Sequence, residues 1–303
     1  MSQTPAAPAG ERLDVRKTYK LYVGGSFPRS ESGRTYAVHG ADGRVLAQAA
    51  LASRKDARDA VVAARSAVAK WSGATAYNRG QVLYRVAEML EGRTAQLADL
   101  VEQAEGVSAA DARAQVAAAV DRWVWYAGWT DKIAQVAGNA NPVAGPYFNL
   151  SVPEPTGVVA VLAPQRSSLL GLTSVVAPVV ATGCTCVVVT SFERPLPAVA
   201  LGEVLATSDV PGGVVNLLTG SAAELGPWLA SHRDVDALDL TGAAALTDPT
   251  WGGLEAAAAD TLTRVLRPAD LPDGEEPDWT AAPDPRRMLA VMETKTVWHP
   301  KGR

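Results

Sequence analysis

The sequence has few of the residues from which reactive centres and charged binding surfaces are built. Its 303 residues include two cysteines and three histidines, and 28 basic against 32 acidic side chains give a net charge of −4. Without a basic excess there is no field to gather phosphates, so we expect neither nucleic acid nor an anionic membrane as a partner. The histidines (His39, His232 and His299) are scattered and no Cys-x-x-Cys occurs, so we expect no transition-metal site.

Long apolar runs are also absent. The apolar segments, such as residues 157–163, are too short to span a bilayer, and residues 1–10 lack the basic start and apolar core of a signal peptide. We therefore expect a cytoplasmic protein with reduced thiols. Cys184 and Cys186 would share a face of one strand, which does not suit a disulfide. No His or Lys adjoins Cys184 to lower its pKa, so we interpret both as buried structural thiols rather than nucleophiles.

The first half of the chain changes character three times. Residues 1–20, rich in Ala, Pro and charge, predict a mobile tail. Residues 21–50 alternate apolar residues with glycine-rich turns, which predicts short antiparallel strands in a lid-like segment. Residues 53–129 have helical spacing and predict about three long helices, one of them over residues 78–106.

Two further segments predict exposed strands. Residues 141–155 are Pro-rich, and the alternation in "YFNLSVPEP" fits an exposed hairpin. Residues 288–300 contain "VMETKTVW", which also alternates as a strand does. Residues 254–268 predict one more helix, and residues 269–287 are so rich in Pro and acid that we expect a linker there.

The most regular pattern lies between residues 156 and 242. Apolar, β-branched runs such as "TGVVAVLA", "TCVVVT", "GVVNLLTG" and "VDALDLTG" alternate there with three helical segments. This alternation is typical of a parallel sheet with helices on both faces. The sequence therefore predicts an α/β fold with a Rossmann-like βαβαβαβ unit.

Eight stretches, in order along the chain, resemble the aldehyde dehydrogenase superfamily. They are "LYVGGSF", "AVVAARSAVAKW", "YAGWTDKI", "PEPTGVVAVLAP", "APVVATGCTCVVV", "VPGGVVNLLTGSAAELG", "DVDALDLTG" and the terminal "METKTVWHP". They cover most of residues 21–242 and the last dozen residues. The resemblance implies that residues 21–268 form a cofactor-type domain of this family, joined to a small β oligomerisation element.

The end of the first strand departs from the family pattern. The family has Pro-Trp-Asn-Phe-Pro there, and its Asn donates a hydrogen bond to the oxyanion formed when a thiolate attacks the aldehyde. In the aligned stretch "PQRSS", Arg166 replaces that Asn, and its longer, forked side chain cannot take the same geometry. Two interpretations stay open: an anion pocket made by Arg166, Ser167 and Ser168 at a helix N-terminus, or a solvated helix cap.

The residues that would hold a dinucleotide are partly lost. Of the family's Lys-Pro-Ser-Glu after the second strand only Glu193 remains, and Ala243 stands where a Ser would meet the pyrophosphate. Glu193 is either a residual ribose contact or a carboxylate that favours a helix start. Gly220 and Gly242 end strands at the edge where such folds bind ligands, although tight turns explain both equally well. We expect no cofactor, or NAD(P) if any.

The resemblance also exposes a missing part. After "LTG" a full-length member continues into a second α/β domain that holds the Cys nucleophile and the Glu general base. Here only 45 residues, Ala244 to Met288, precede the family-like terminal strand, whereas a domain typically needs about 50–250 residues. We therefore expect the catalytic domain to be excised, and no catalytic residue in this chain.

Two hypotheses about function follow. In the family, the hairpin near residues 141–155 and the terminal strand, here 288–300, form the oligomerisation element, which adds to the catalytic-domain sheet of a neighbour. The chain would thus be a non-catalytic partner or assembly subunit of a full-length aldehyde dehydrogenase, or would pair with itself. The alternative is an NAD(P)-binding oxidoreductase component that acts on aldehydes with its site completed in trans. A third hypothesis is a relic that binds another nucleotide or anion at Arg166.

Overall fold

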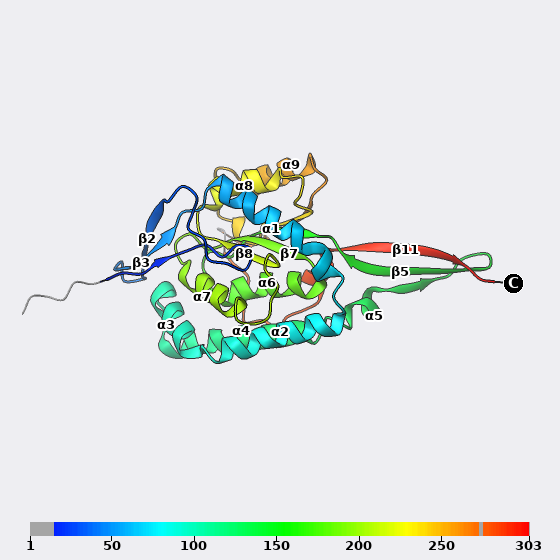
Figure 1. Ribbon diagram of the computed structural model, residues 1–303, viewed down its shortest axis with the longest axis horizontal. Coiled ribbons are helices and arrows are strands. Elements are labelled where there is room, and N and C mark those ends of the chain that lie inside the picture. Colours follow the sequence, from blue (N-terminus) through cyan, green and yellow to red (C-terminus); the bar gives the residue numbers. More distant parts are fainter. Residues whose placement is uncertain (1–14, 273–274, 303) are drawn as a thin grey trace, which may run out of the picture.

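A five-stranded parallel sheet lies at the centre of the computed structural model, which describes residues 15–272 and 275–302 (Figure 1). The strands are β6 (Val158–Leu162), β7 (Thr185–Val189), β8 (Val215–Leu218), β9 (Ala237–Asp239) and β10 (Arg264–Leu266). Their order is β10-β9-β6-β7-β8, and all pairs are parallel. The predicted α/β fold with a Rossmann-like sheet and flanking helices is confirmed.

Alternating side chains divide the core between the two faces of this sheet. On β6, Ala160 and Leu162 join one apolar cluster, and Val159 and Val161 join the other. Strands that are buried on both faces need such continuous apolar runs. The first face is covered by α1 (Arg54–Ser72), α8 (Ala222–Ala230) and α9 (Trp251–Ala259). The second is covered by α2 (Ala76–Glu91), α3 (Thr94–Glu105), α4 (Ala109–Ala127), α6 (Leu170–Thr182) and α7 (Leu196–Leu205).

The helical region before the sheet contains four long helices, α1 to α4, rather than about three. The helix predicted over residues 78–106 is divided in two, because Gly92 ends α2 and Arg93 precedes the start of α3. A short helix, α5 (Ile133–Ala137), follows α4. None of the helices in the described ranges is long and apolar enough to cross a membrane.

The N-terminal strands form a separate small sheet of β1 (Thr18–Tyr19), β2 (Thr35–His39) and β3 (Val45–Ala50). The mobile tail was predicted over residues 1–20, but residues 18–19 of that range form β1. Residues 1–14 lie outside the described residues, but Thr18 and Tyr19 pair in parallel with Gln48 and Ala49 of β3.

Three antiparallel strands form an arm that projects from the body (Figure 1). They are β4 (Asn139–Asn141), β5 (Tyr147–Pro155) and β11 (Met292–Pro300), and we call residues 139–155 and 292–300 the arm. β11 pairs with β5 from Met292 opposite Pro155 to Pro300 opposite Tyr147. The terminal strand begins later than the predicted residue 288, because residues 286–289 form the short helix α10 (Arg286–Leu289).

For residues 254–287 the structure corrects the end of the predicted helix and the last residues of the predicted linker. The helix expected over 254–268 ends at Ala259, and Leu262 takes a left-handed conformation (φ 56°) that turns the chain into β10. The linker expected over 269–287 has little regular structure in its described part, yet residues 275–287 make specific contacts with the body, which are given below. Its final residues already belong to α10.

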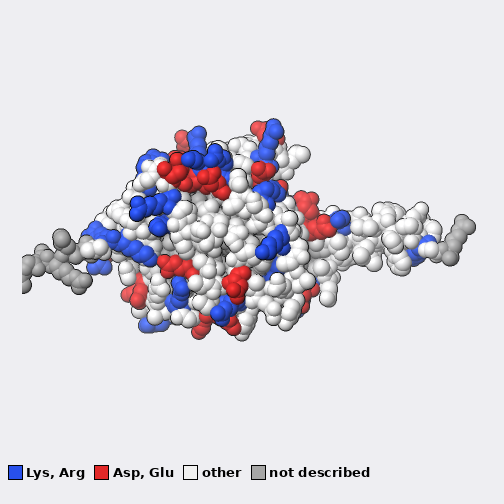
Figure 2. All heavy atoms as spheres, in the orientation of Figure 1, with Lys and Arg blue, Asp and Glu red and all other residues white. Residues whose placement is uncertain are grey.

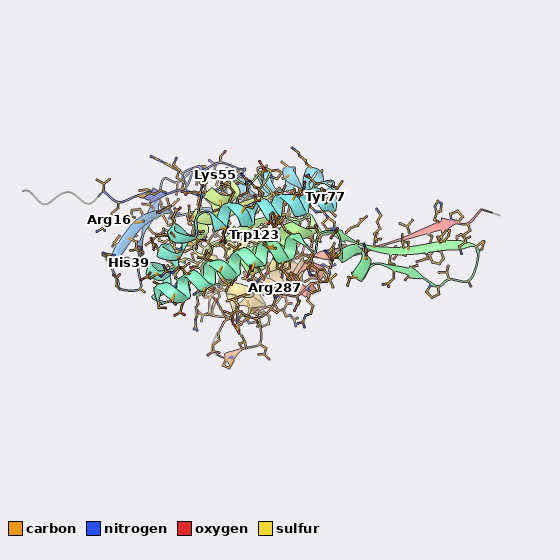
Figure 3. All side chains as sticks on the ribbon, turned by 90° about the horizontal axis from the view of Figure 1, so that it is seen from below. Arg16, His39, Lys55, Tyr77, Trp123 and Arg287 are labelled. Atoms are coloured by element: carbon orange, nitrogen blue, oxygen red, sulfur yellow. The ribbon has the colours of Figure 1, made fainter. Side chains whose placement is uncertain are left out.

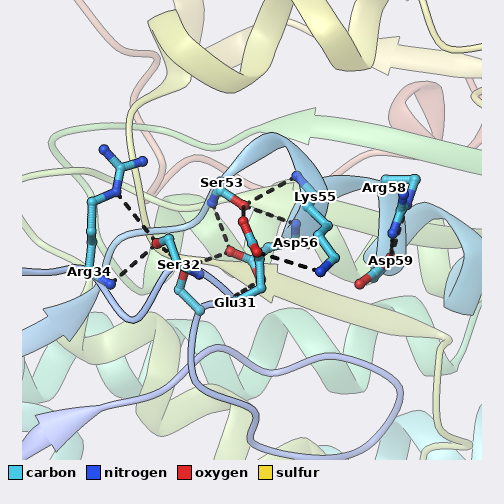
Figure 4. A network of polar contacts seen from close by, with 9 residues as sticks. Glu31, Ser32, Arg34, Ser53, Lys55, Asp56, Arg58 and Asp59 are labelled. Atoms are coloured by element: carbon cyan, nitrogen blue, oxygen red, sulfur yellow. Dashed lines mark hydrogen bonds and ion pairs between the residues drawn. The ribbon is translucent and has the colours of Figure 1, made fainter.

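A capping box starts α1 and also fastens the N-terminal segment to it. Ser53 Oγ accepts hydrogen bonds from the N–H groups of Lys55 and Asp56, and the Asp56 carboxylate accepts one from the Ser53 N–H at 2.8 Å. The same carboxylate accepts from Ser30 Oγ at 2.7 Å and from the Glu31 N–H at 3.0 Å (Figure 4). One buried carboxylate thus joins the loop after the first strand to the first helix.

Replacing this carboxylate should destabilise the whole domain. We expect Asp56→Ala to lower the free energy of unfolding by about 2–4 kcal/mol, because it leaves buried donors unsatisfied and removes one half of the capping box. Asp59→Ala, on the same helix with an exposed partner in Arg58, is the control and should cost less than about 1 kcal/mol. Urea unfolding measures both variants. Equal losses would contradict the role assigned to Asp56.

Candidate functional site

The turn after β6 lies at the carboxyl edge of the sheet and contains Arg166, the residue predicted to replace an oxyanion-binding Asn. The backbone N–H groups of Gln165, Arg166 and Ser167 all donate to the carboxylate of Glu276, at 2.5, 2.7 and 3.1 Å. The Arg166 carbonyl accepts a hydrogen bond from Arg194 at 2.6 Å, while the Arg166 side chain is exposed. The N–H groups that could hold an anion here are therefore already bound to a carboxylate of the chain itself.

The two serines beside Arg166 are also bound to other groups of the chain. Ser168 donates from its N–H and its hydroxyl to one oxygen of Glu105, at 2.7 and 2.6 Å. Ser167 Oγ accepts from the N–H of Gly171 in the first turn of α6, at 2.9 Å. A carboxylate at a helix N-terminus is electrostatically favourable. The Ser167 hydroxyl thus caps the first turn of α6, and the N–H groups of residues 165–168 are bound by carboxylates of the chain itself. An external-anion pocket at Arg166 stays a prediction.

A cavity of about 430 Å³ lies against this turn. Two arginines and four acidic residues line it, together with others: Arg166, Arg194, Glu105, Glu275, Glu276 and Asp278. Because acid predominates, the charge of the lining opposes a polyanion such as a pyrophosphate.

Glu193 lies at the end of β7, in a different setting. It is exposed and lines a second cavity, of about 460 Å³, together with His39, Arg194 and a stacked pair of rings. The pair is Tyr36 and Phe192, whose ring centroids are 4.6 Å apart and nearly parallel at 9°. The carboxylate of Glu193 makes no hydrogen bond with the part of the chain that the structure describes. Its assignment to a ribose stays a prediction.

Close packing accounts for one candidate glycine, Gly242, and backbone conformation accounts for the other, Gly220. A Cβ added to Gly242 would overlap the carbonyl oxygen of Ala163 at the end of β6, so this position requires glycine. Gly220 has a φ of +156° and lies against Ala52. Beside Gly242, the Ala243 side chain is fully buried in the apolar cluster on the α8 and α9 face. Ligand binding by Gly220 or Gly242 is a prediction that these contacts leave open.

Both thiols are free and buried with no exposed surface, as the sequence predicted. Burial raises the pKa of Cys184 and also that of Cys186. The Cys184 thiol lies 3.3 Å from the carbonyl oxygen of Val291, just before β11. Neither thiol has the access or the ionisation that a nucleophile needs. The described residues also contain no group of His, Cys, Asp and Glu that could hold a metal ion.

Sequence reasoning missed the residues that cover this edge. Arg287 pairs with Asp239 at the end of β9, with 3.2 Å between the nitrogen and the carboxylate oxygen, and also bonds to Thr241 at 3.3 Å. Asp239 is 1% exposed. Glu276 and Arg287 both come from the segment interpreted as a linker. Its composition carried no periodic signal, because its contacts are formed by single side chains rather than by a helix or strand face.

Comparison with known proteins places this chain among the aldehyde dehydrogenases. Residues 27–265 match the model of the aldehyde dehydrogenase family. The putative aldehyde dehydrogenase DhaS of Bacillus subtilis is 32% identical over 232 residues, which are 75% of this chain and 46% of that one. The cytosolic 10-formyltetrahydrofolate dehydrogenase of Mus musculus is 32% identical over 77% of this chain and 26% of its own length. The NAD+ complex of an aldehyde dehydrogenase from Bacillus cereus has a TM-score of 0.77 at 28% identity, over 82% of this chain and 50% of that one. The chain thus spans half or less of the length of these relatives.

The packing role of Gly242 can be tested against a second glycine. We expect Gly242→Ala to cost about 1–3 kcal/mol of unfolding free energy, because the methyl group would push two backbone segments apart. Gly253→Ala places the same methyl on the exposed side of α9, with ordinary contacts only, and should be neutral or stabilise by up to about 1 kcal/mol. Thermal and urea unfolding measure both. A Gly242→Ala variant as stable as the Gly253→Ala variant would contradict the close approach of Gly242 to the Ala163 carbonyl group.

Proposed function

Because this chain belongs to the aldehyde dehydrogenase family, we propose that it is a non-catalytic member that serves as a partner or assembly subunit of a full-length aldehyde dehydrogenase. The observation that carries the proposal is the arm, which exposes apolar side chains and whose outer strand, β11, pairs with β5 alone among the described residues. Pairing with a second copy of the chain would use the same surface.

The two faces of the arm carry different kinds of side chain. Directly opposed residues of antiparallel strands share a face, so Leu150 lies beside Val297, and Phe148 lies next to Leu150 on that side. These three side chains are 48%, 45% and 63% exposed. Large apolar groups gathered on one exposed face mark an interaction surface. In the view of Figure 2 the arm is almost free of charged side chains except near its base and its tip.

The opposite face of the arm carries polar contacts among its own strands, beside the partly exposed rings of Tyr147 and Trp298. Asn149 and Ser151 are buried there. Ser151 Oγ lies 2.8 Å from the Thr296 hydroxyl of β11, and the Asn141 amide of β4 donates to Asn149 and Ser151 at 2.6 and 2.8 Å. These contacts hold the three strands together and so present the apolar face as a formed surface. A preformed surface binds without the cost of ordering it.

The rest of the chain supports a role without chemistry of its own. Between residues 244 and 288, the described residues form α9, β10, the first part of α10 and irregular segments, but no second α/β domain. Arg166 stands where the family resemblance implies an oxyanion-binding Asn, and neither thiol is accessible. A dehydrogenase reaction through a thiolate would therefore need residues from another chain.

Charge on the apolar face of the arm should abolish partner binding. We expect native mass spectrometry of the chain, co-expressed with a full-length aldehyde dehydrogenase from the same organism, to detect a mixed complex. Val297→Glu should weaken capture at least about tenfold, which corresponds to about 1.4 kcal/mol, because it places a carboxylate in the interface. Val62→Glu makes the same change at an exposed position of α1 (55% exposed) and should leave capture unchanged. A monomer that captures no dehydrogenase subunit, or equal effects of both variants, would contradict the proposal.

Two observations favour a second function. The fold resembles that of an aldehyde dehydrogenase solved with NAD+, and the exposed Glu193 carboxylate after β7 makes no hydrogen bond with the described residues. In this second function the chain would bind NAD(P), and a second chain would complete the site that acts on aldehydes. Titration calorimetry with NAD+, NADH, NADP+ and NADPH at millimolar concentrations, with and without the dehydrogenase, distinguishes this second function from the non-catalytic role. We expect no binding. Binding that Glu193→Ala abolishes would instead establish the second function.

A further inference from the structure

We propose that residues 275–287 form a strap by which the chain closes its own ligand-binding edge, with the Glu276 carboxylate acting as a built-in anion. In open α/β sheets the crevice outside the carboxyl ends of the strands is where ligands bind. Here that edge is covered by the chain itself. The inference concerns the isolated chain and does not depend on the partner role proposed for the arm.

The Glu276 carboxylate uses both of its oxygens at this edge. Oε1 accepts from the N–H groups of Gln165 and Arg166, and Oε2 accepts from that of Ser167. Oε2 also accepts from the indole N–H of Trp279, at 3.0 Å. Hydrogen bonds to an ionised acceptor are the stronger kind, and four of them converge on one group. An external anion would have to displace this set to reach the same N–H groups.

The middle of the strap is held by α4. Arg122, which is 8% exposed, donates to the carbonyl oxygens of Trp279 at 2.6 Å and of Ala281 at 3.1 Å. The Tyr126 hydroxyl donates to the carbonyl oxygen of Asp284 at 3.3 Å. Because these donors bind backbone oxygens, they fix the path of the strap whatever its side chains are.

The far end of the strap is fixed at β9. Arg287 forms its ion pair with the buried Asp239 and lies over the ring of Trp279, 5.4 Å from the ring centroid. Figure 3 shows Arg287 beside α4, on which Trp123 is labelled. The strap therefore runs from the end of β6 to the end of β9, two strands that are neighbours in the sheet. Trp279 joins the two attachments, since it contacts both Glu276 and Arg287.

Tethering explains why an internal carboxylate excludes external ones. A group on the same chain has an effective concentration in the millimolar range or above, so free anions at lower concentration do not replace it. Removing the carboxylate should therefore have two effects. The N–H groups of residues 165–167 should lose protection, and they should become accessible to a small carboxylate from solution.

Hydrogen exchange of the purified chain tests both effects. In Glu276→Ala, exchange over residues 165–167 should be at least about tenfold faster than in the natural sequence, because local opening no longer breaks charge-assisted hydrogen bonds. Acetate at about 0.1 M, against chloride at equal ionic strength, should restore most of this protection. Glu275→Ala is the matched control, since it removes the neighbouring exposed glutamate of the same cavity, and it should change neither rate.

The proposal fails if Glu276→Ala exchanges like Glu275→Ala, or if acetate slows exchange equally in both. Should Glu276→Ala not fold, Glu276→Gln keeps the size and removes the charge, and an intermediate increase of about threefold or more is expected. Exchange at the natural rate in that variant would overturn the proposal as well. No dehydrogenase is present in these measurements, so their failure would leave the function proposed for the arm untouched.

Discussion

Backbone and side-chain polar groups that leave water must find partners, and this requirement governs how the chain covers one edge of its central sheet. At the carboxyl edge of the sheet the turn after β6 presents three N–H groups, and Glu276 satisfies all of them from within the chain. Asp239, buried at the end of β9, is satisfied by Arg287. At the arm, by contrast, the apolar face around Leu150 remains uncovered. The chain thus covers the carboxyl edge of its sheet with its own residues and leaves exposed the apolar face of the arm, which is the surface we propose for a partner.

This asymmetry fits the proposed role, because the described residues include no second α/β domain. The segment that follows β9 is too short for a second α/β domain, and its described part lies across the sheet edge as a strap before it continues into β11. β11 still pairs with β5 along its whole length. An arm built in this way retains its register and its apolar face without any contribution from a catalytic domain of its own chain.

The sequence predicted the elements that depend on repeated patterns. The four runs that became β6, β7, β8 and β9 are apolar and β-branched, because each strand is buried on both faces, and this signal is strong. The division between α2 and α3 was missed, since helical spacing continues past Gly92. β10 was missed because three residues are too few to establish a period against the preceding helix.

The sequence predicted where the candidate site lies in the fold but not which residues contact it. Arg166 was correctly placed in the turn after the first strand of the sheet, but its neighbour across space, Glu276, lies 110 positions later in a segment without periodicity. The four contacts of one carboxylate leave no trace in local composition. The family resemblance implied that Arg166 stands in the place of an Asn, whereas the structure was needed to find Glu276 bound to the same turn.

The measurement that tests the central claim most directly is native mass spectrometry of this chain co-expressed with a full-length aldehyde dehydrogenase. The account predicts a complex that contains both chains and that is lost when a charge is placed at Val297. A chain that stays monomeric at micromolar concentration beside the dehydrogenase would contradict it.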